Sequence, residues 1–446
     1  MTRTEKLLAE LIALPSVNPA FAMQSAVGTR GPRVRPPGSA SRPYLCYGEK
    51  KVADFLATVA AHAGLEVEFQ KVSPGESKGW GETPGEPVLA DGHSGSRGRS
   101  PHQIEETGLA RSNVIVRLLP PGKIRQTILL APHLDTVGAD DSQFVPRQKN
   151  GRLYGRGACD TKGSVAAMLT ALCELANAKS RPSETEIVFA GLVDEENVQA
   201  GSRALVRSSA FRRLGQLTAS AGHLKAELQT TLAIVGEPTR LQVVTAHKGS
   251  LWLQIETRGR AAHGATPQLG KNAVHEMARI VDALETDYAA RLRRRRHPLL
   301  GTATVNVGMI SGGAQPNIVP DRCAITIDRR TLPGETESGV RWEIAALLRA
   351  KKLPAKISSK KLAPCLPLET NPKLSLVRHF LRSVGQTQPV GVDFFCDAAV
   401  LSAGGIPSVV FGPGDIAQAH TVDEWISLAS LERGKNLLLN FLKSLP

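Results

Sequence analysis

The sequence predicts an α/β fold: a mostly parallel sheet covered by helices, with a smaller α+β module inserted into the chain. Strand-like and helix-like segments alternate through the first half, which is typical of a parallel sheet. Several of these strands are continuous apolar runs, as expected for strands that are buried on both faces. From about residue 248 the strands alternate apolar and polar residues instead, and the first pattern resumes near residue 359.

Two domains follow from the length and from these changes of pattern. The 446 residues are too many for one ordinary hydrophobic core. We expect a larger domain formed by residues 1–247 and 359–446, with a smaller domain, residues 248–358, inserted between its two parts. Two segments of the larger domain, near residues 28–43 and 73–100, are rich in Gly, Pro, Ser and charge. We expect both segments to be flexible surface insertions.

Local patterns predict the elements of the larger domain. Helical spacing of the apolar residues predicts helices before Pro15, over 50–64 and over 164–178. Alternation or an unbroken apolar run predicts strands over 65–72, 126–132, 185–193 and 231–236. This succession is compatible with one sheet that carries helices on both faces.

The inserted module is predicted from three alternating strands and one long helix. The strands cover 250–259, 303–313 and 322–332, and the helix covers 270–294. A basic run, 291–298, closes this helix. We interpret the run as a solvated helix end before a proline, and an anion-binding patch is the alternative interpretation.

The composition and the N-terminus narrow the class of protein. The charged fraction of 22% and the hydrophobic fraction of 41% are those of a globular chain. Glu5, Lys6 and Glu10 interrupt the N-terminal segment where a signal peptide needs an apolar core. No run approaches the roughly 20 apolar residues that a membrane span needs. We therefore expect a cytoplasmic protein with no membrane partner.

The net charge of +14 raises the question of nucleic-acid binding. Aromatic residues make up only 4% of the chain, no nucleic-acid motif is present, and much of the excess charge lies in loops and in one basic run. No nucleic-acid partner is expected. The six cysteines are scattered without a CxxC pair, which argues against a zinc knuckle or a disulfide framework and indicates buried free thiols.

Polar residues stand where three of the predicted strands end. They are His133 and Asp135 after the first strand, Glu195 and Glu196 after the second, and Glu237 after the third. Asp160 at the start of a helix and His420 after a further strand-like segment extend this set. In an open α/β sheet the loops beyond the carboxyl ends of the strands converge on one crevice, where ligands bind. We therefore expect these side chains to face one another.

Each of these residues alone has an ordinary structural interpretation, since a lone Asp before a helix is commonly an N-cap. Together, however, the carboxylates would repel one another and be partly protonated unless a cation compensated them. Imidazole and carboxylate without Cys suit Zn²⁺, with Co²⁺ or Mn²⁺ as substitutes. Five ligands suit two ions about 3.5 Å apart, with one bridging carboxylate and a water or hydroxide held between the ions.

Adjacent glutamates suggest the reaction. If Glu196 binds a metal ion, Glu195 points elsewhere and can accept the proton of the attacking water. The same residue can then deliver that proton to a leaving amine. This pairing predicts metal-assisted hydrolysis of an amide.

An ordered series of motifs resembles the di-zinc amidohydrolase family that includes acetylornithine deacetylase, succinyl-diaminopimelate desuccinylase, aminoacylase and carboxypeptidase G. The motifs include "APHLDTV", "GRGACDTKG", "DEEN", "GEPT", "GRAAHGATPQLGKNAV", "GGAQPNIVP" and "AHTVDEW". The resemblance runs from the first helix to the C-terminus, outside the two insertions. It implies a zinc-peptidase-like catalytic domain with an inserted lid and dimerisation domain.

The resemblance also implies a role for each site residue. Five residues would hold two zinc ions: Asp160 bridging both, His133 and Glu237 at one ion, and Glu196 and His420 at the other. Glu195 would be the general base. Asp135 would orient the imidazole of His133, as expected for a carboxylate two residues along a strand end.

In the lid, the resemblance implies that His263 reaches into the active site of a partner subunit and stabilises the oxyanion. Asn317 and Arg330 would hold the carboxylate of the substrate, and Gly412 and Gly414 would lie near its backbone. A homodimer formed through the lid is therefore expected. The alternatives are local: the histidine could cap nearby structure, and the arginine could pair with an aspartate two residues before it.

The expected function is hydrolysis of the amide of an N-acyl amino acid, and the motifs look most like the acetylornithine deacetylase branch. A dipeptidase, a carboxypeptidase or a succinyl-diaminopimelate desuccinylase of the same family would share every ligand. A catalytically inactive binding protein on the same scaffold is the alternative from another class. Such a protein would be expected to have lost Glu195 or a ligand, and all of them are present.

Overall fold

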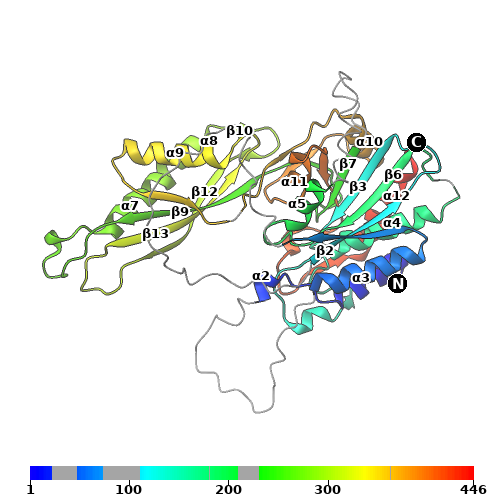
Figure 1. The fold of residues 1–446 in the computed structure, drawn as a ribbon, viewed down its shortest axis with the longest axis horizontal. Helices are drawn as coiled ribbons and strands as arrows, with labels where there is room; N and C mark the ends of the chain where they lie inside the picture. The colour runs from blue at the N-terminus through cyan, green and yellow to red at the C-terminus, as the bar shows by residue number, and fades with distance from the viewer. Residues whose placement is uncertain (23–47, 74–110, 180, 209–230, 362) are drawn as a thin grey trace, which may run out of the picture.

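A computed structural model describes residues 1–22, 48–73, 111–179, 181–208, 231–361 and 363–446 (Figure 1). The predicted insertions at 28–43 and 73–100 lie outside the described residues, apart from Ser73. In the described parts of the chain, no helix has the length and apolar character needed to cross a membrane. The five cysteines described there are buried free thiols, as predicted.

A nine-stranded sheet forms the centre of the larger part of the molecule. Its order is β1-β2-β6-β3-β7-β17-β8-β15, and β16 also pairs with β8. The strands are β1 (Glu66–Val72), β2 (Arg111–Leu118), β3 (Gln126–Pro132), β6 (Thr185–Gly191), β7 (Thr231–Gly236), β8 (Val244–His247), β15 (Leu368–Glu369), β16 (Val390–Val392) and β17 (Ser408–Val410). The central strands β6, β3, β7 and β17 are parallel, and antiparallel strands flank them. The predicted mixed α/β fold with a mostly parallel central sheet is confirmed.

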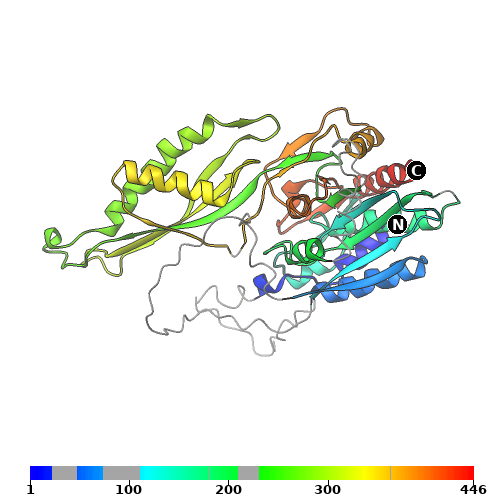
Figure 2. The same ribbon diagram turned by 45° about the horizontal axis from the view of Figure 1, so that its top comes forward.

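Helices cover both faces of this sheet (Figures 1 and 2). The covering helices are α1 (Arg3–Ile12), α3 (Gly48–His62), α4 (Lys162–Ala176), α5 (Ala200–Arg207), α10 (Ser375–Ser383), α11 (Ala398–Ala403) and α12 (Leu428–Lys443). The short helix α2 (Pro19–Ala22) contributes no residue to the cores on either face. Successive side chains of β3 point to opposite faces. Ile128 and Leu130 join the apolar core under α1, α3, α4 and α12, whereas Leu129 and Ala131 join a second core under α5 and α11. Burial on both faces explains why this strand is an unbroken apolar run.

A separate antiparallel sheet, in the order β12-β13-β9-β14, extends away from the larger part (Figure 2). Its strands are β9 (Gly249–Arg258), β12 (Thr304–Gly312), β13 (Arg322–Thr331) and β14 (Lys356–Ser359). It packs with α7 (Ala273–Ala283), α8 (Ala289–Arg293) and α9 (Glu337–Ala350) around its own apolar core. The sequence patterns predicted three of the four strands but not β14, which is only four residues long.

The predicted long helix over 270–294 is interrupted. Asn272 caps α7 by accepting hydrogen bonds from the backbone of Val274 and His275, so the helix begins three residues later than expected. A π-helical turn over Leu284–Tyr288 separates α7 from α8. The basic run then leaves the helix after Arg293, because residues Arg296–His297 form the short strand β10 with β11 (Gly301–Thr302).

Short elements complete the described chain. A three-stranded sheet consists of β4 (Arg147–Lys149), β5 (Arg152–Tyr154) and β18 (Trp425–Ser427). This sheet brings the segment before α4 against the segment after His420, although the two lie far apart in the sequence. Three 3₁₀ turns are η2 (Asp141–Phe144), η3 (Pro267–Leu269) and η5 (Ile416–Gln418).

Candidate metal centre

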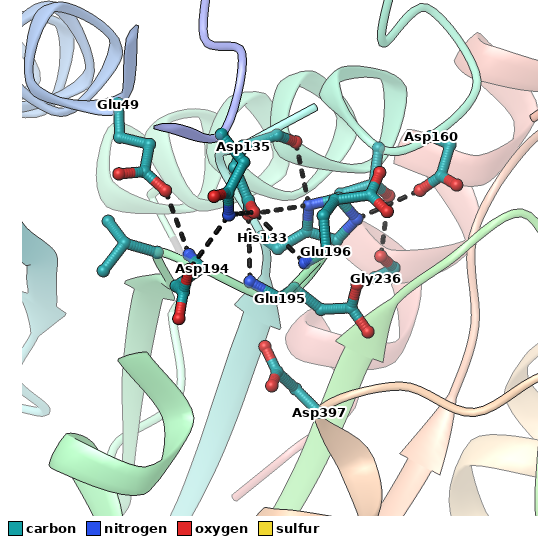
Figure 3. Close-up of polar contacts among 12 residues, drawn as sticks. Glu49, His133, Asp135, Asp160, Asp194, Glu195, Glu196, Gly236 and Asp397 are labelled. Carbon is teal, nitrogen blue, oxygen red and sulfur yellow. Dashed lines mark hydrogen bonds and ion pairs between the residues drawn. The ribbon is translucent and has the colours of Figure 1, made fainter. Parts of the chain in front are cut away.

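The ends of three neighbouring parallel strands carry the candidate site. Their order in the sheet is β6-β3-β7, so their carboxyl ends lie at one edge. His133 follows β3 directly, Glu237 follows β7 directly, and Glu195 and Glu196 lie in the loop after β6. Figure 3 shows the side chains from the ends of β3 and β6 converging with Asp160 from the loop before α4. The sheet order therefore brings together residues that the sequence separates by up to about a hundred positions.

One group consists of three buried side chains. Nε2 of His133 lies 3.0 Å from Oδ1 of Asp160 and 3.9 Å from Oε1 of Glu237. One ligand atom from each residue lies within 4.8 Å of the other two. The hydroxyl of Thr161 donates to the carbonyl of Gly236 at 2.7 Å, which ties the Asp160 loop to the end of β7. The three side chains are spaced as the ligands of one metal ion would be.

A second group shares Asp160 with the first. Nε2 of His420 lies 3.4 Å from Oδ2 of Asp160 and 3.2 Å from Oε1 of Glu196. His420 is the accessible member, with 53% of its side chain exposed. The two oxygens of Asp160 therefore face the two groups separately, one oxygen to each. This is the arrangement that a carboxylate bridging two ions requires.

Electrostatics favour a cation at this place. Burial, reinforced by neighbouring carboxylates, raises the pKa of Glu195 and of Glu237 well above its ordinary value. Within the described ranges, no Lys or Arg side chain forms an ion pair with these two residues, Asp160 or Glu196. Two divalent cations would supply the missing positive charge, and the donors are those of borderline-soft metals.

Without a metal ion, protonated His133 and His420 supply positive charge beside the carboxylates. Hydrogen bonds to Asp160 and Glu196 raise the pKa of His420 to about 10. Burial opposes protonation of His133, but contacts with Asp135 and Asp160 raise its pKa above the ordinary value. Burial likewise opposes ionisation of Asp160, and the same two histidines nevertheless lower its pKa. A metal ion would take the place of the proton on each Nε2.

Asp135 holds the loop that carries both glutamates. Its carboxylate accepts hydrogen bonds from the backbone N–H groups of Glu195 and Glu196, each at 3.1 Å (Figure 3). Nδ1 of His133 lies 3.4 Å from this carboxylate but only 3.0 Å from the backbone carbonyl of Asp135. The sequence suggested the carboxylate as the partner of the imidazole. The carbonyl makes the shorter contact, and the carboxylate mainly organises the Glu195–Glu196 turn.

Glu195 is placed differently from its neighbour. Its side chain is buried, with 8% of the residue exposed. Among the described residues, no hydrogen bond reaches its carboxylate, while that of Glu196 contacts His420. Burial raises the pKa of Glu195, and the negative charges of Glu237 and Asp397 raise it further. A raised pKa and an uncommitted carboxylate are the properties of a general base.

The lid residues lie on the separate sheet module. His263 and Asn317 are exposed, and the strand-like pairing of His263 with Ile318 joins their two loops. Nδ1 of His263 accepts a hydrogen bond from Ala265, which matches the local alternative, and Arg330 pairs with Asp328 at 3.0 Å, as its alternative also suggested. In the part of the chain that the structure describes, no hydrogen bond or ion pair connects these residues with the two metal-ligand groups.

Gly412 and Gly414 lie against the loop that follows β7. A Cβ atom on Gly412 would stand 2.5 Å from the carbonyl oxygen of Glu237, and one on Gly414 would stand 2.5 Å from Sγ of Cys159. Gly414 also has a φ of +95°. Both positions therefore need glycine for close packing beside the candidate ligands.

Sequence reasoning missed two buried acids beside the site. Glu424 accepts hydrogen bonds from the backbone of Asp160 and two neighbouring residues, and pairs with Arg156 at 2.8 Å. Its position four residues after His420 in one motif was the available signal. Asp397 lies below Glu195 in Figure 3, accepts a hydrogen bond from Ser202 at 2.6 Å, and has a pKa that burial raises to about 7.

Comparison with known proteins defines the class. The model of peptidase family M20/M25/M40 matches residues 129–444. The chain belongs to this family and is a metallohydrolase. An acetylornithine deacetylase of Myxococcus xanthus is 30% identical over 346 residues, which are 75% of this chain and 84% of that protein. An acetylornithine deacetylase of Buchnera aphidicola is 29% identical over 71% of this chain and 80% of that protein.

Solved structures share the fold at low sequence identity. The M20 family metallo-carboxypeptidase Sso-CP2 of Sulfolobus solfataricus is 17% identical, with a TM-score of 0.63 and 99% of each chain covered. The YXEP protein of Bacillus subtilis, a dinuclear metal-binding peptidase of the same family, is 11% identical, with a TM-score of 0.60, 99% of this chain and 97% of that chain covered. The resemblance predicted from the motifs is thereby confirmed at the level of the family.

Proposed function

We propose that this protein hydrolyses the amide bond of N-acyl amino acids, and that its substrates resemble N-acetylornithine. The observation that carries the proposal is the position of Asp160, whose two oxygens face two separate His and Glu pairs beside the uncommitted carboxylate of Glu195. The acetylornithine deacetylases among the relatives support the choice of substrate.

Five residues would hold two divalent cations, which we propose to be Zn²⁺. They are Asp160 at both ions, His133 and Glu237 at one, and Glu196 and His420 at the other. When bound, such ions supply Lewis acidity to the amide carbonyl and to the attacking water. Co²⁺ and Mn²⁺ prefer similar donors and are expected to substitute.

Glu195 moves the proton. Its carboxylate takes the proton from the attacking water and gives it to the nitrogen of the departing amine. Asp135 holds the backbone of Glu195 at 3.1 Å, so that the base keeps its place during both transfers. Burial keeps competing solvent away and raises the pKa of the carboxyl group, which favours its acid form in the second transfer.

The separate module, residues 248–358, acts in this proposal as lid and dimerisation domain. Arg330 offers a planar fork for the carboxylate of the substrate, and Asn317 adds a second polar contact. The exposed His263 serves the site of a second subunit, where it stabilises the oxyanion. Gly412 lies beside the substrate backbone.

A substrate panel tests the proposal. The protein is loaded with Zn²⁺ or Co²⁺ and offered N-acetylornithine, N-succinyl-diaminopimelate, other N-acyl amino acids and dipeptides. We expect the fastest hydrolysis with N-acetylornithine or a close analogue. Preference for dipeptides would reassign the protein to the peptidases of the same family. No hydrolysis of any amide would favour a binding protein.

Glu195→Gln tests the proposed base, and Glu184→Gln is the matched control because Glu184 pairs with Arg125 at the surface. Glu195→Gln should lower kcat by at least about 100-fold while the metal content by elemental analysis is unchanged. Glu184→Gln should retain both. Full activity of Glu195→Gln would exclude this residue as the base.

A further inference from the structure

A chain of buried polar contacts lies behind the candidate ligands. It begins at Glu49 near the start of α3, passes through Arg111 and Asp194, and reaches Asp135 through Asn18. Figure 3 shows Glu49, Asp194 and Asp135 on the side of the cluster away from Asp160. All three carboxylates are buried.

Arg111 binds two acids at once. Nε and Nη2 of this arginine donate to the two oxygens of Glu49 at 2.7 and 2.5 Å, and Nη1 donates to Oδ1 of Asp194 at 2.7 Å. Glu49 also accepts a hydrogen bond from the backbone N–H of Asp194 at 3.0 Å. Asp194 has a φ of +69°, a conformation that a non-glycine residue adopts only when its surroundings impose it. The ion pair thus holds Asp194 by both its side chain and its backbone.

Asn18 connects this ion pair to the site. Its amide group donates one hydrogen bond to Oδ2 of Asp135 at 2.7 Å and one to Oδ1 of Asp194 at 2.9 Å. Asp135 and Asp194 are therefore held together by the two N–H groups of one side chain. The backbone places Asn18 there, because its N–H donates to the carbonyl of Thr136 at 2.8 Å and Thr136 donates back to Ser16 at 2.9 Å.

These contacts end on both glutamates of the site. Asp194 immediately precedes Glu195, and Asp135 holds the backbone of Glu195 and Glu196. Asn18, Glu49 and Arg111 all precede residue 129, where the match to the family model begins. Part of the support for the Glu195–Glu196 turn therefore comes from residues that the family model does not cover.

We propose that Arg111 and Asn18 are positioning residues that hold the Glu195–Glu196 turn in its working geometry. This inference rests on the proposed function, in which one glutamate is the base and the other a ligand. Some residues support metal ligands through hydrogen bonds without binding the metal themselves. Removing such a residue commonly lowers metal affinity or activity by about 10- to 100-fold. Neither residue touches the ligand groups directly, so each acts through Asp135 and Asp194.

The second arginine of β2 provides a matched control. At the far end of the strand, Arg117 donates through Nε and Nη2 to one oxygen, Oε1, of the buried carboxylate of Glu186, whereas Arg111 donates through the same two groups to both oxygens of Glu49. Arg111→Met removes the ion pairs with Glu49 and Asp194, and Arg117→Met removes the ion pair with Glu186. Both are expected to lower the melting temperature, but only the first removes support from the site.

Two readouts separate positioning from general stability. The first is Co²⁺ binding, followed by the visible absorption of the metal and independent of any substrate. The second is kcat and KM with the best substrate of the panel, measured well below the melting temperature of each variant. Arg111→Met and Asn18→Leu should weaken Co²⁺ binding and lower kcat about 10- to 100-fold while KM changes less than about threefold. Arg117→Met should keep the Co²⁺ affinity and kcat within about twofold of the wild-type values.

Asn18→Ser is a milder variant that can be used if Asn18→Leu does not fold. Because the serine hydroxyl can donate to one carboxylate, Asn18→Ser should show activity between those of the wild type and Asn18→Leu. Equal effects of Arg111→Met and Arg117→Met on Co²⁺ binding and kcat would overturn the inference. If the wild type hydrolyses nothing in the panel, the proposed function fails. The Co²⁺ readout then still decides whether Arg111 and Asn18 position the metal ligands.

Discussion

Oε1 of Glu424 accepts a hydrogen bond from the backbone N–H of Asp160 at 3.0 Å. The same carboxylate accepts the N–H groups of Gly157 and Cys159 and pairs with Arg156. A buried residue that follows His420 in the chain therefore shapes the loop that presents Asp160. Glu424 therefore supports Asp160, the residue that the two ligand groups share.

Glu424→Gln should strongly destabilise the protein. A glutamine has one accepting oxygen, so its NH₂ group would face donors that now bind the second oxygen. We expect the free energy of unfolding in urea to fall by about 3 kcal/mol. Glu174→Gln, which breaks the more exposed pair with Lys435, should cost less than about 1 kcal/mol. If both variants lost the same unfolding free energy, the Glu424 contacts would contribute no more to stability than the Glu174–Lys435 pair.

Gly412→Ala should disturb Glu237 through the backbone. The added Cβ would meet the Glu237 carbonyl at 2.5 Å, and this contact cannot be relieved by a side-chain rotation. We expect an unfolding free energy lower by about 1–3 kcal/mol and a clear loss of activity. Gly308→Ala is the control, since its Cβ would make only ordinary contacts, at 3.7 and 3.9 Å. Full activity of Gly412→Ala would contradict close packing at this position.

Metal removal should destabilise the folded protein. A ligand that binds only the folded state adds about 4 kcal/mol when its concentration is 1,000 times its dissociation constant. Chelation should therefore lower the melting temperature of the wild type, measured by calorimetry, and Zn²⁺ should restore it. Asp160→Asn should abolish this response, because Asp160 belongs to both groups. An unchanged response in Asp160→Asn would contradict a bridging role.

His420→Ala should leave one of the two ions, because His420 belongs to only one of the groups. Elemental analysis after removal of free metal would then find about half the content of the wild type. Loss of both ions would show that the two positions fill only together. Asp415→Asn is the control, because Asp415 pairs with Arg240 and belongs to neither group. This variant should retain the full metal content.

The buried His247 should contribute a pH dependence to stability. Burial lowers its pKa to about 4 in the folded protein, while the unfolded chain takes up the proton near 6.5. The unfolded state binds more protons between these values, so stability falls as pH falls from about 6.5 to 4. This difference between the folded and unfolded pKa values corresponds to about 3 kcal/mol of unfolding free energy. His247→Asn should flatten this part of the profile of unfolding free energy against pH, and an unaltered slope would contradict the assignment.

Mixing inactive protomers tests the role of His263 across a dimer. A His263→Ala protomer and a Glu195→Gln protomer each lack one proposed group. If the histidine acts in the partner's site, the mixed dimer contains one complete site and should recover up to about half of the wild-type activity per dimer after exchange of subunits. Absence of recovery, with mixed dimers present by native mass spectrometry, would indicate action within one chain.

Much of the fold could be predicted because its signals are local. The apolar runs that end directly before His133 and Glu237 can be recognised without knowing their neighbours, since burial on both faces of the sheet demands them. β14 was missed because four residues carry too little pattern, and the π-helical turn in 284–288 was missed because its apolar spacing still looks helical.

The apolar runs alone indicate which residues end the buried strands, and therefore which side chains could meet at the edge of the sheet. How these side chains meet became known from the folded molecule: Asp160 faces both groups, Asp135 holds the Glu195 turn, and Arg111 supports Asp194. Strand order and loop geometry arise from packing between distant segments. Local periodicity does not record which strands become neighbours.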